Sequence, residues 1–419
     1  MPILSFITKT LDDFGETYLY ERNLYTRKIE PFIDKPVIKV ITGMRRVGKS
    51  SLLLLLQKQL LDRGIPERNI LFINKESLTY EHVQTHSDLN DEVKRIFSGV
   101  KGKKYLFLDE VQMISQWERA AASFLADGVA DLFIAGSNAS LLSSELATLL
   151  SGRYVEFPLY PLSFPEYLRF RKQREPTDEE FSRYLRYGGF PGIHHIVLQD
   201  QVVYQYINSL FNTILLKDVI QRNNVRNIAL LEQITRFVFD NIGNIFSAKK
   251  VADFLKSQRK HVGVDTVYNY ISYLEAGFLL HRVPRYDVRG KRHLEVHEKY
   301  FIGDIGLRHA YLGYREGDIS GILENVVFLA LKQRGYRVSV GKVQDREVDF
   351  ISERENHKEY IQVAYLLADT RTTEREFTPL QNIEDNYPKT VLSMDREWGT
   401  DVQGIRRKSI IDFLMEEEP

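Results

Sequence analysis

The stretch Val37-Ile38-Lys39-Val40-Ile41-Thr42-Gly43-Met44-Arg45-Arg46-Val47-Gly48-Lys49-Ser50-Ser51 decides the fold of this chain. Its β-branched start predicts a strand, its glycines a loop, and the leucines that follow it a helix. The stretch fits the pattern G-x-x-x-x-G-K-[ST], in which loop N–H groups surround phosphates, the lysine reaches the β- and γ-phosphates and a hydroxyl binds Mg²⁺. The alternative is an ordinary glycine turn, but the strand-to-helix context favours a nucleotide site. Its residues are Gly43, Met44, Arg45, Arg46, Val47, Gly48, Lys49, Ser50 and Ser51.

Composition limits the class of protein. At 419 residues the chain is long enough for two to four domains of about 150 residues each. Lys plus Arg equals Asp plus Glu, so any basic surface must be local. The absence of cysteine excludes disulfides, thiolate catalysis and cysteine-ligated zinc. We find no signal peptide pattern and no run of about 18 apolar residues, which predicts a cytoplasmic protein without membrane contact.

The first half alternates between strand and helix patterns. Residues 1–34 predict a helical lead-in whose aromatic residues either cover the nucleotide base or pack on the sheet, and their helical spacing favours packing. Residues 35–162 predict a P-loop NTPase core with further strands at 69–74, 104–110, 131–135 and 154–157. Repeated β-α-β units with continuously apolar strands predict a mostly parallel, doubly wound sheet, with ligands at the carboxyl ends of its strands.

Two acids end the apolar strand at 104–110. At the carboxyl edge of a parallel sheet, Asp109 is placed to hold Mg²⁺ and Glu110 to orient or deprotonate the attacking water. The alternative is that this pair only caps the following segment. The distance downstream of the phosphate loop favours catalysis.

Two further residues are candidates for sensing the γ-phosphate. Asn138 follows the strand at 131–135, where it either senses the γ-phosphate or the water, or caps the next helix. Arg153 opens the strand at 154–157 and would sense the γ-phosphate in its own subunit or reach that of a neighbour in a homo-oligomer. A solvated arginine is the alternative.

Several motifs resemble one known family. They are the phosphate loop, Leu106-Phe107-Leu108-Asp109-Glu110 with Val111-Gln112 and Trp117, Ala135-Gly136-Ser137, and Gly152-Arg153 followed by Pro158-Leu159-Tyr160-Pro161-Leu162-Ser163-Phe164. Together they resemble the AAA-type ATPases, and more closely the bacterial and archaeal branch with a fused C-terminal domain of unknown function (AAA_14/DUF4143-like). The resemblance implies ATP as the nucleotide, Mg²⁺ as its cofactor, and a helical lid after the core.

The middle of the chain has a different pattern. Residues 163–226 predict a helical lid or connector, and residues 227–302 predict three helices and a β-hairpin in winged-helix order. Residues 221–300 carry 14 Lys plus Arg against 8 Asp plus Glu, an excess that favours contact with double-stranded DNA. Winged helices also contact proteins, so a protein partner is the alternative. The candidate phosphate contacts are Lys249, Lys250, Arg259, Arg289, Lys291 and Arg292.

Residues 303–419 predict an α/β domain. The glycine-rich segment 303–321 reads as a linker, and the acids and strands that follow resemble the core of restriction-endonuclease-like nucleases. That resemblance implies metal ligands at Glu324 and Asp349, whereas Gln362 and Ala364 stand where a glutamate and a catalytic lysine belong. Losing both weakens the electrostatics of phosphodiester cleavage, so we expect a degenerate core with weak or no cutting.

The sequence therefore predicts an Mg²⁺-dependent ATPase coupled to a winged-helix and a nuclease-like region acting on DNA or on a protein partner. The first rival is a slow ATP-dependent regulatory switch acting through protein partners. The second is an ATP-coupled DNA nuclease. The third is a small-molecule kinase, against which stand the appended domains and the lack of an obvious acceptor pocket.

Overall fold

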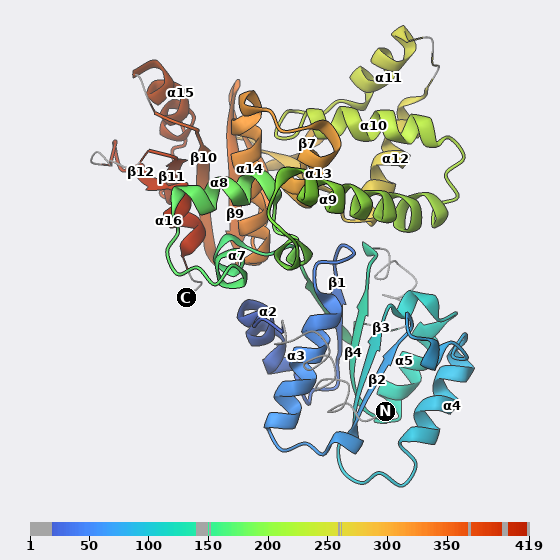
Figure 1. Cartoon of the computed structure of the whole chain (residues 1–419). Helices are drawn as coiled ribbons and strands as arrows, with labels where there is room; N and C mark the ends of the chain where they lie inside the picture. Colours follow the sequence, from blue (N-terminus) through green and yellow to red (C-terminus); the bar gives the residue numbers. More distant parts are fainter. Residues whose placement is uncertain are drawn as a thin grey trace. The chain divides into compact units, whose positions relative to one another are not determined.

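The computed structural model describes residues 19–139, 150, 152–258, 260, 262–367, 370–395 and 401–416. The chain divides into two compact units, Met1–Leu159 and Tyr160–Pro419, each with a sheet of its own (Figure 1). Among the described residues, none of the helices combines the length and the apolar character that a bilayer span requires.

The first unit contains a five-stranded parallel sheet of order β2-β3-β4-β1-β5. Its strands are β1 Ile38–Thr42, β2 Ile70–Asn74, β3 Tyr105–Asp109, β4 Asp131–Gly136 and β5 Tyr154–Pro158. These strands lie where the sequence predicts them, and the parallel α/β sheet is confirmed. All residues of β1, β3 and β4 are buried, as continuously apolar central strands require.

Helices cover this sheet. They are α2 Asn23–Ile29, α3 Lys49–Asp62, α4 His86–Ile96 and α5 Trp117–Ala126. Residues of α4 and α5 share one core cluster with alternate residues of the strands, among them Val40, Leu106 and Ile134. Because successive strand side chains point to opposite faces, Phe107 and Phe133 lie on the other face, where their rings stack at 4.4 Å.

The lead-in helix α2 packs on the first unit. Its Tyr25 and Ile29 are buried, which agrees with the packing interpretation of the lead-in residues. Arg22, directly before the helix, is also buried and lies 4.8 Å from the centre of the Tyr25 ring. The lead-in therefore brings a buried guanidinium to the part of the unit that holds the phosphate loop.

Strand β4 lies between β1 and β3, so the strand that ends in the two acids is not the direct neighbour of the phosphate-loop strand. The register pairs Thr42 with Gly136, and Leu108 with Ile134. Since all three strands run parallel, the phosphate loop, the residues after Gly136 and the Asp109-Glu110 pair leave the sheet at the same edge.

A buried ion pair lies at the opposite edge of this sheet. The Lys39 ammonium contacts the Asp131 carboxylate, both side chains are almost fully buried, and the backbone N–H of Asp34 donates to the same carboxylate at 2.8 Å. Breaking such a pair leaves an uncompensated charge in the protein interior.

We expect Lys39→Met to lower the free energy of unfolding by roughly 3–5 kcal/mol, because Asp131 would stay buried without its cation. The matched control is Lys103→Met, since Lys103 pairs with Asp34 at 2.8 Å while both side chains are about half exposed. That change should cost about 0–1 kcal/mol. Urea unfolding of the full chain measures both, and equal losses would contradict a special role for the buried pair.

The second unit begins with helices. They are α7 Phe164–Phe170, α8 Asp178–Tyr187, α9 Asp200–Ile214 with its π-helical continuation Leu215–Gln221, α10 Ile228–Asp240, α11 Ala248–Ser257 and α12 Val264–Ala276. The helical character predicted for residues 163–226 is therefore present. The three helices predicted within residues 227–302 also form, as α10, α11 and α12.

The hairpin that follows these helices is not a free wing. Strands β6 Leu280–Asp287 and β7 Arg292–Ile302 form one side of a seven-stranded sheet of order β12-β11-β10-β9-β8-β6-β7. The other strands are β8 Arg337–Val343, β9 Arg346–Arg354, β10 His357–Val363, β11 Lys389–Ser393 and β12 Arg406–Ser409. Because β6 pairs with β8, the boundary proposed between residues 302 and 303 falls inside one sheet.

The predicted linker at residues 303–321 is wrong. This segment contains α13 Ile305–Leu312, most of whose residues are buried, and a short 3-10 turn, before α14 Ile319–Gln333. Asp304 caps α13 and also accepts a hydrogen bond from the Gly189 N–H at 2.7 Å. The glycines here allow close backbone packing: a Cβ on Gly306 would lie 2.3 Å from the Tyr187 carbonyl oxygen. Helices α15 Thr370–Gln381 and α16 Ile410–Met415 complete the unit.

Candidate functional site

The phosphate loop has a conformation that its glycines make possible. Gly43 has a φ of 152° and Gly48 a φ of 101°, which disfavours any residue with a side chain. A Cβ on Gly43 would lie 2.3 Å from the Leu159 carbonyl oxygen. Gly48 caps the N-terminus of α3, whose first N–H groups lack helical partners and favour an anion.

Lys49 lies across the loop. Its buried ammonium donates to the Gly43 carbonyl at 2.9 Å and to the Met44 carbonyl at 3.0 Å. Arg22 supports the loop from outside, because its guanidinium donates to the Val47 carbonyl at 3.1 Å. These two cations hold three loop carbonyls, so the loop is preorganised around a positive charge that a phosphate can share.

Asp109 is the buried acid of the pair. Burial raises the pKa of its carboxyl to about 6, while the Ser50 hydroxyl and the Lys49 ammonium act to lower it. One oxygen accepts from the Glu110 N–H at 3.0 Å, and the other has no hydrogen-bond partner among the described residues. A buried carboxylate oxygen without a partner, next to a hydroxyl on the phosphate loop, has the donor chemistry that Mg²⁺ prefers.

Glu110 is held by two neighbours. Its carboxylate accepts from the Gln112 amide, and from the Ser137 hydroxyl at 3.3 Å. Glu110 has a φ of 51°, and this left-handed backbone begins the turn after β3. Asn138 is also buried at this edge, directly after Ser137. The structure therefore brings together the phosphate loop, both acids and the Ser137-Asn138 segment, as the sequence predicts.

Arg153 does not join them. It precedes β5, and the first residue of β5, Tyr154, pairs with Ile38 at the start of β1, whereas the phosphate loop follows Thr42 at the end of β1. Five residues at about 3.3 Å each separate the two edges by roughly 16 Å. Arg153 is also exposed. Sensing of a γ-phosphate by Arg153 within its own subunit is therefore wrong, and its use on a neighbouring subunit stays a prediction.

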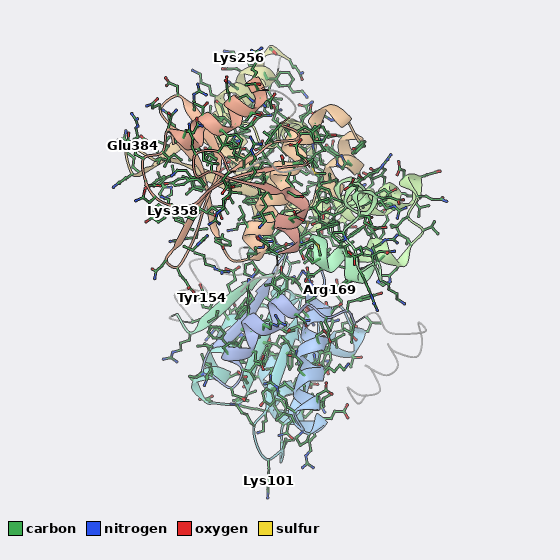
Figure 2. All side chains as sticks on the ribbon, turned by 90° about the vertical axis from the view of Figure 1, so that its left-hand side faces the viewer. Lys101, Tyr154, Arg169, Lys256, Lys358 and Glu384 are labelled. Atoms are coloured by element: carbon green, nitrogen blue, oxygen red, sulfur yellow. The ribbon has the colours of Figure 1, made fainter. Side chains whose placement is uncertain are left out.

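The residues predicted to contact DNA lie on two elements of the second unit. Lys249 and Lys250 are exposed in the first turn of α11, and Lys256 is exposed near its end (Figure 2). Lys291 and Arg292 are exposed at the β6–β7 turn, and Arg289 there lies 3.7 Å from the Glu384 carboxylate. Arg259 lies outside the described residues.

The predicted nuclease core contains an unpredicted lysine. Lys299 of β7 is almost fully buried, and its ammonium lies 3.2 Å from Glu324, 2.6 Å from Glu347 and 3.7 Å from Asp349. Burial acts to lower the pKa of Lys299, but the three carboxylates outweigh it and raise that pKa. Burial also raises the pKa of Glu324 to about 8 and that of Asp349 to about 6.

Gln362 is a connector in this cluster. Its amide oxygen accepts from the Asp349 N–H at 3.3 Å, and its amide nitrogen donates to the Glu376 carboxylate at 2.9 Å. An ionised glutamate could not donate to Glu376, whereas the amide makes both contacts at neutral pH.

We expect Gln362→Glu to lower the free energy of unfolding by roughly 1–3 kcal/mol at pH 7, because two buried carboxylates would face each other. Their repulsion raises the folded-state pKa of the pair above its unfolded value, so the loss should shrink as the pH falls toward 5. Thermal unfolding at both pH values measures it. Gln381→Glu, on an exposed part of α15, is the control and should change little.

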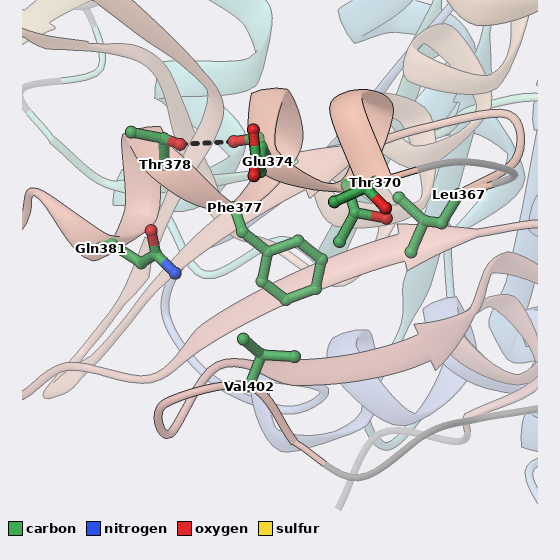
Figure 3. Close-up of a pocket in the computed structure, with 8 residues that line it drawn as sticks. Leu367, Thr370, Glu374, Phe377, Thr378, Gln381 and Val402 are labelled. Carbon is green, nitrogen blue, oxygen red and sulfur yellow. Dashed lines mark hydrogen bonds between the residues drawn. The ribbon is translucent and has the colours of Figure 1, made fainter.

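A pocket of about 420 Å³ lies beside α15 (Figure 3). Phe377 and Val402 contribute apolar surface, and Thr370, Thr378 and Gln381 contribute polar groups. None of the predicted site residues lines it, so the predicted chemistry and this pocket are separate.

The chain is similar to several uncharacterised proteins. It is 36% identical over 402 residues to an uncharacterised protein of Haemophilus influenzae, across 95% of this chain and 99% of that protein. The chain belongs to the same family. It is also 31% identical over 367 residues to the uncharacterised protein MJ1544 of Methanocaldococcus jannaschii, across 84% of this chain and 79% of that protein.

Two family models match parts of the chain. One, described as an AAA domain, matches residues 35–168, and the other, described as a domain of unknown function (DUF8612), matches residues 178–318. This chain therefore carries an AAA-type P-loop ATPase domain over residues 35–168. The domain of unknown function that matches is DUF8612, whereas the DUF4143 name and the restriction-endonuclease-like core stay predictions.

Two solved structures match large parts of the chain at low TM-scores. The Walker-type ATPase PABY2304 of Pyrococcus abyssi has a TM-score of 0.49 at 15% identity, covering 70% of this chain and 95% of that protein. The ORC1 protein of Aeropyrum pernix in complex with DNA has a TM-score of 0.32 at 14% identity, covering 72% and 94%. Both scores are below 0.5, so neither bears on function.

Sequence reasoning missed four residues of these sites. Arg22, Gln112 and Ser137 lie at the nucleotide site, and Lys299 lies in the carboxylate cluster. Gln112 and Ser137 stand within the motifs quoted for the family, which was a usable signal. No sequence signal identified Lys299, because its partners come from segments more than 20 residues away.

Proposed function

We propose that this chain is an Mg²⁺-dependent ATPase whose nucleotide state is coupled to its second unit. The observation that carries the proposal is the unpartnered, buried oxygen of Asp109 beside the Ser50 hydroxyl, at the sheet edge where Lys49 and Glu110 also lie. An arrangement of this kind can bind a nucleoside triphosphate, hold its cation and place an acid near the attacking water.

Each residue has one role in this proposal. Lys49 and the loop N–H groups bind the β- and γ-phosphates, and Ser50 and Asp109 would hold Mg²⁺. When bound, the cation neutralises charge that develops on the phosphate oxygens. Glu110 accepts a proton from the attacking water, and Asn138 orients that water or the γ-phosphate.

A slow regulatory switch is the second candidate, and the contacts of Glu110 favour it. The Oε2 oxygen of this acid accepts hydrogen bonds from both Gln112 and Ser137, so in this state that oxygen is engaged with the protein instead of with water. Proton transfer to this oxygen then requires Glu110 to exchange these donors for water. In this candidate, binding of a partner sets the rate of that exchange.

One experiment separates the candidates. ATP hydrolysis by the purified full chain is measured with Mg²⁺ or with EDTA, each with and without duplex DNA, together with the dissociation rate of bound ATP. Steady hydrolysis that needs Mg²⁺ supports the ATPase, and acceleration by DNA supports the coupling. Slow, DNA-independent hydrolysis with slow ATP release favours the switch. No Mg²⁺-linked binding of ATP would refute both.

For the DNA role we propose that the β6–β7 turn contacts the phosphate backbone. Neutralising Arg289, Lys291 and Arg292 together should reduce the salt slope of duplex binding by about 0.9 for each phosphate that these side chains neutralise. Fluorescence anisotropy over a salt series measures this slope. The control neutralises the exposed residues Lys58, Lys94 and Lys101, the last of which is labelled in Figure 2. Equal slopes in both triple variants would place the DNA elsewhere.

A further inference from the structure

The carboxylate cluster of the second unit is organised around the ammonium of Lys299. Side chains from two other elements face this one nitrogen: Glu324 from α14, and Glu347 and Asp349 from β9, at 2.6–3.7 Å. The lysine side chain is 3% exposed, whereas those of Glu324 and Glu347 are 13% and 27% exposed. The ammonium therefore lies deeper than two of the acids that surround it.

A divalent cation does not fit among these residues as they stand. Mg²⁺ requires its oxygen ligands at about 2.0–2.1 Å, and the place between the carboxylates is taken by a positive nitrogen. Within the described part of the chain, no group of three or more acidic or histidine side chains is arranged to hold a metal ion. The resemblance to nucleases implies a metal at Glu324 and Asp349, and the structure disagrees with that implication.

We propose that the Lys299 ammonium permanently takes the place of the divalent cation between Glu324, Glu347 and Asp349. The domain then keeps a nuclease-like set of acids without the metal, and its charge is balanced by a residue of its own chain. Lys299 also explains how three acids can approach one another in the interior, since buried carboxylates require a partner cation.

The main rival is that Lys299 is a catalytic lysine that works beside a metal. Such a lysine faces the attacking hydroxide and leaves the carboxylates free to bind the cation. Here Glu347 and Glu324 both lie within 3.2 Å of the ammonium, so the lysine engages the ligand oxygens themselves. Gln362 adds no ligand, because its amide is bonded to Asp349 and Glu376.

The test is Mn²⁺ binding by the full-length, nucleotide-free protein, followed by the loss of the free Mn²⁺ signal in electron paramagnetic resonance. All variants carry Asp109→Asn, which removes the charged cation ligand of the proposed ATPase site and leaves only the Ser50 hydroxyl there. In this background we expect Glu324→Gln and Asp349→Asn to leave Mn²⁺ binding unchanged. We expect Lys299→Ala to bind Mn²⁺ at least about tenfold more tightly, and added Asp349→Asn to abolish the gain.

Lys358→Ala is the matched control, because Lys358 faces the single carboxylate of Glu353 at 3.6 Å and its removal should create no site. Thermal unfolding of Lys299→Ala with and without Mn²⁺ gives a second measurement, in which Mn²⁺ should raise the Tm of this variant alone.

Three results would overturn the proposal. They are Mn²⁺ binding in the Lys299-containing protein that is lost in Asp349→Asn, a folded Lys299→Ala variant with no gain in Mn²⁺ affinity, and an equal gain in Lys358→Ala. If Lys299→Ala does not fold, the comparison of Glu324→Gln and Asp349→Asn with the parent decides alone. Because no arm measures ATP hydrolysis, failure here is distinct from failure of the proposed ATPase.

Discussion

Glu110→Gln should lower the rate of ATP hydrolysis by roughly 10² to 10⁴, the range expected when a general base is lost, while ATP binding persists. The amide has nearly the shape of the acid, but it cannot accept the proton of the attacking water. Single-turnover hydrolysis and nucleotide binding, measured on the same preparation, separate the chemical step from affinity.

The control for this change is Glu81→Gln, the same substitution at an exposed position of the first unit. It should leave both rate and affinity as they are. Gln112 and Ser137 contact Glu110, so replacing either should raise the rate of hydrolysis by releasing the acid. Unchanged hydrolysis in Glu110→Gln would remove Glu110 from the mechanism.

Lys49→Ala should weaken ATP binding by roughly 10²-fold, because each hydrogen bond to a charged group contributes about 1.5–3 kcal/mol. Lys49 is the only lysine within the loop pattern, so no other ammonium of the loop replaces it. Hydrolysis should fall at least as far, since the same group would also stabilise charge on the transferred phosphate. Titration with a fluorescent ATP analogue measures the affinity.

Lys58→Ala is the matched control for this experiment. Lys58 belongs to the same helix α3 but is exposed, away from the N-terminus that forms the loop. Its replacement should leave nucleotide affinity within about twofold, because a single solvated charge contributes little. Comparable weakening in both variants would mean that the loop lysine has no special contact with phosphate.

Local patterns predicted the nucleotide site because its chemistry depends on residues close together in the sequence or at strand ends. Gly43, Gly48 and Lys49 form one loop, and Asp109-Glu110 ends a strand whose apolar residues identify it. Parallel strands then bring these ends to one edge without further information.

Strand order and long-range pairing were not available from such patterns. Arg153 was misplaced for a different reason: it precedes the start of β5, and the predicted parallel pairing already puts strand starts at the edge opposite the phosphate loop. The β6–β7 hairpin reads as a wing because the partner strand β8 lies about 50 residues further on. Lys299 joins acids on α14 and β9 for the same reason, and buried lysines have no sequence periodicity of their own.

The pairing of β6 with β8 also limits how this protein can be dissected. Three residues of β6 lie in register with three of β8, namely Arg285, Tyr286 and Asp287 with Val340, Gly341 and Lys342. A fragment that stops at Ile302 would therefore contain β6 without its partner strand. Each fragment would expose an unpaired strand edge with unsatisfied N–H and C=O groups, which is the usual template for aggregation. The roles of the basic helices and of the acids around Lys299 are therefore best distinguished by single substitutions in the intact chain. A truncated chain would show the effects of misfolding instead.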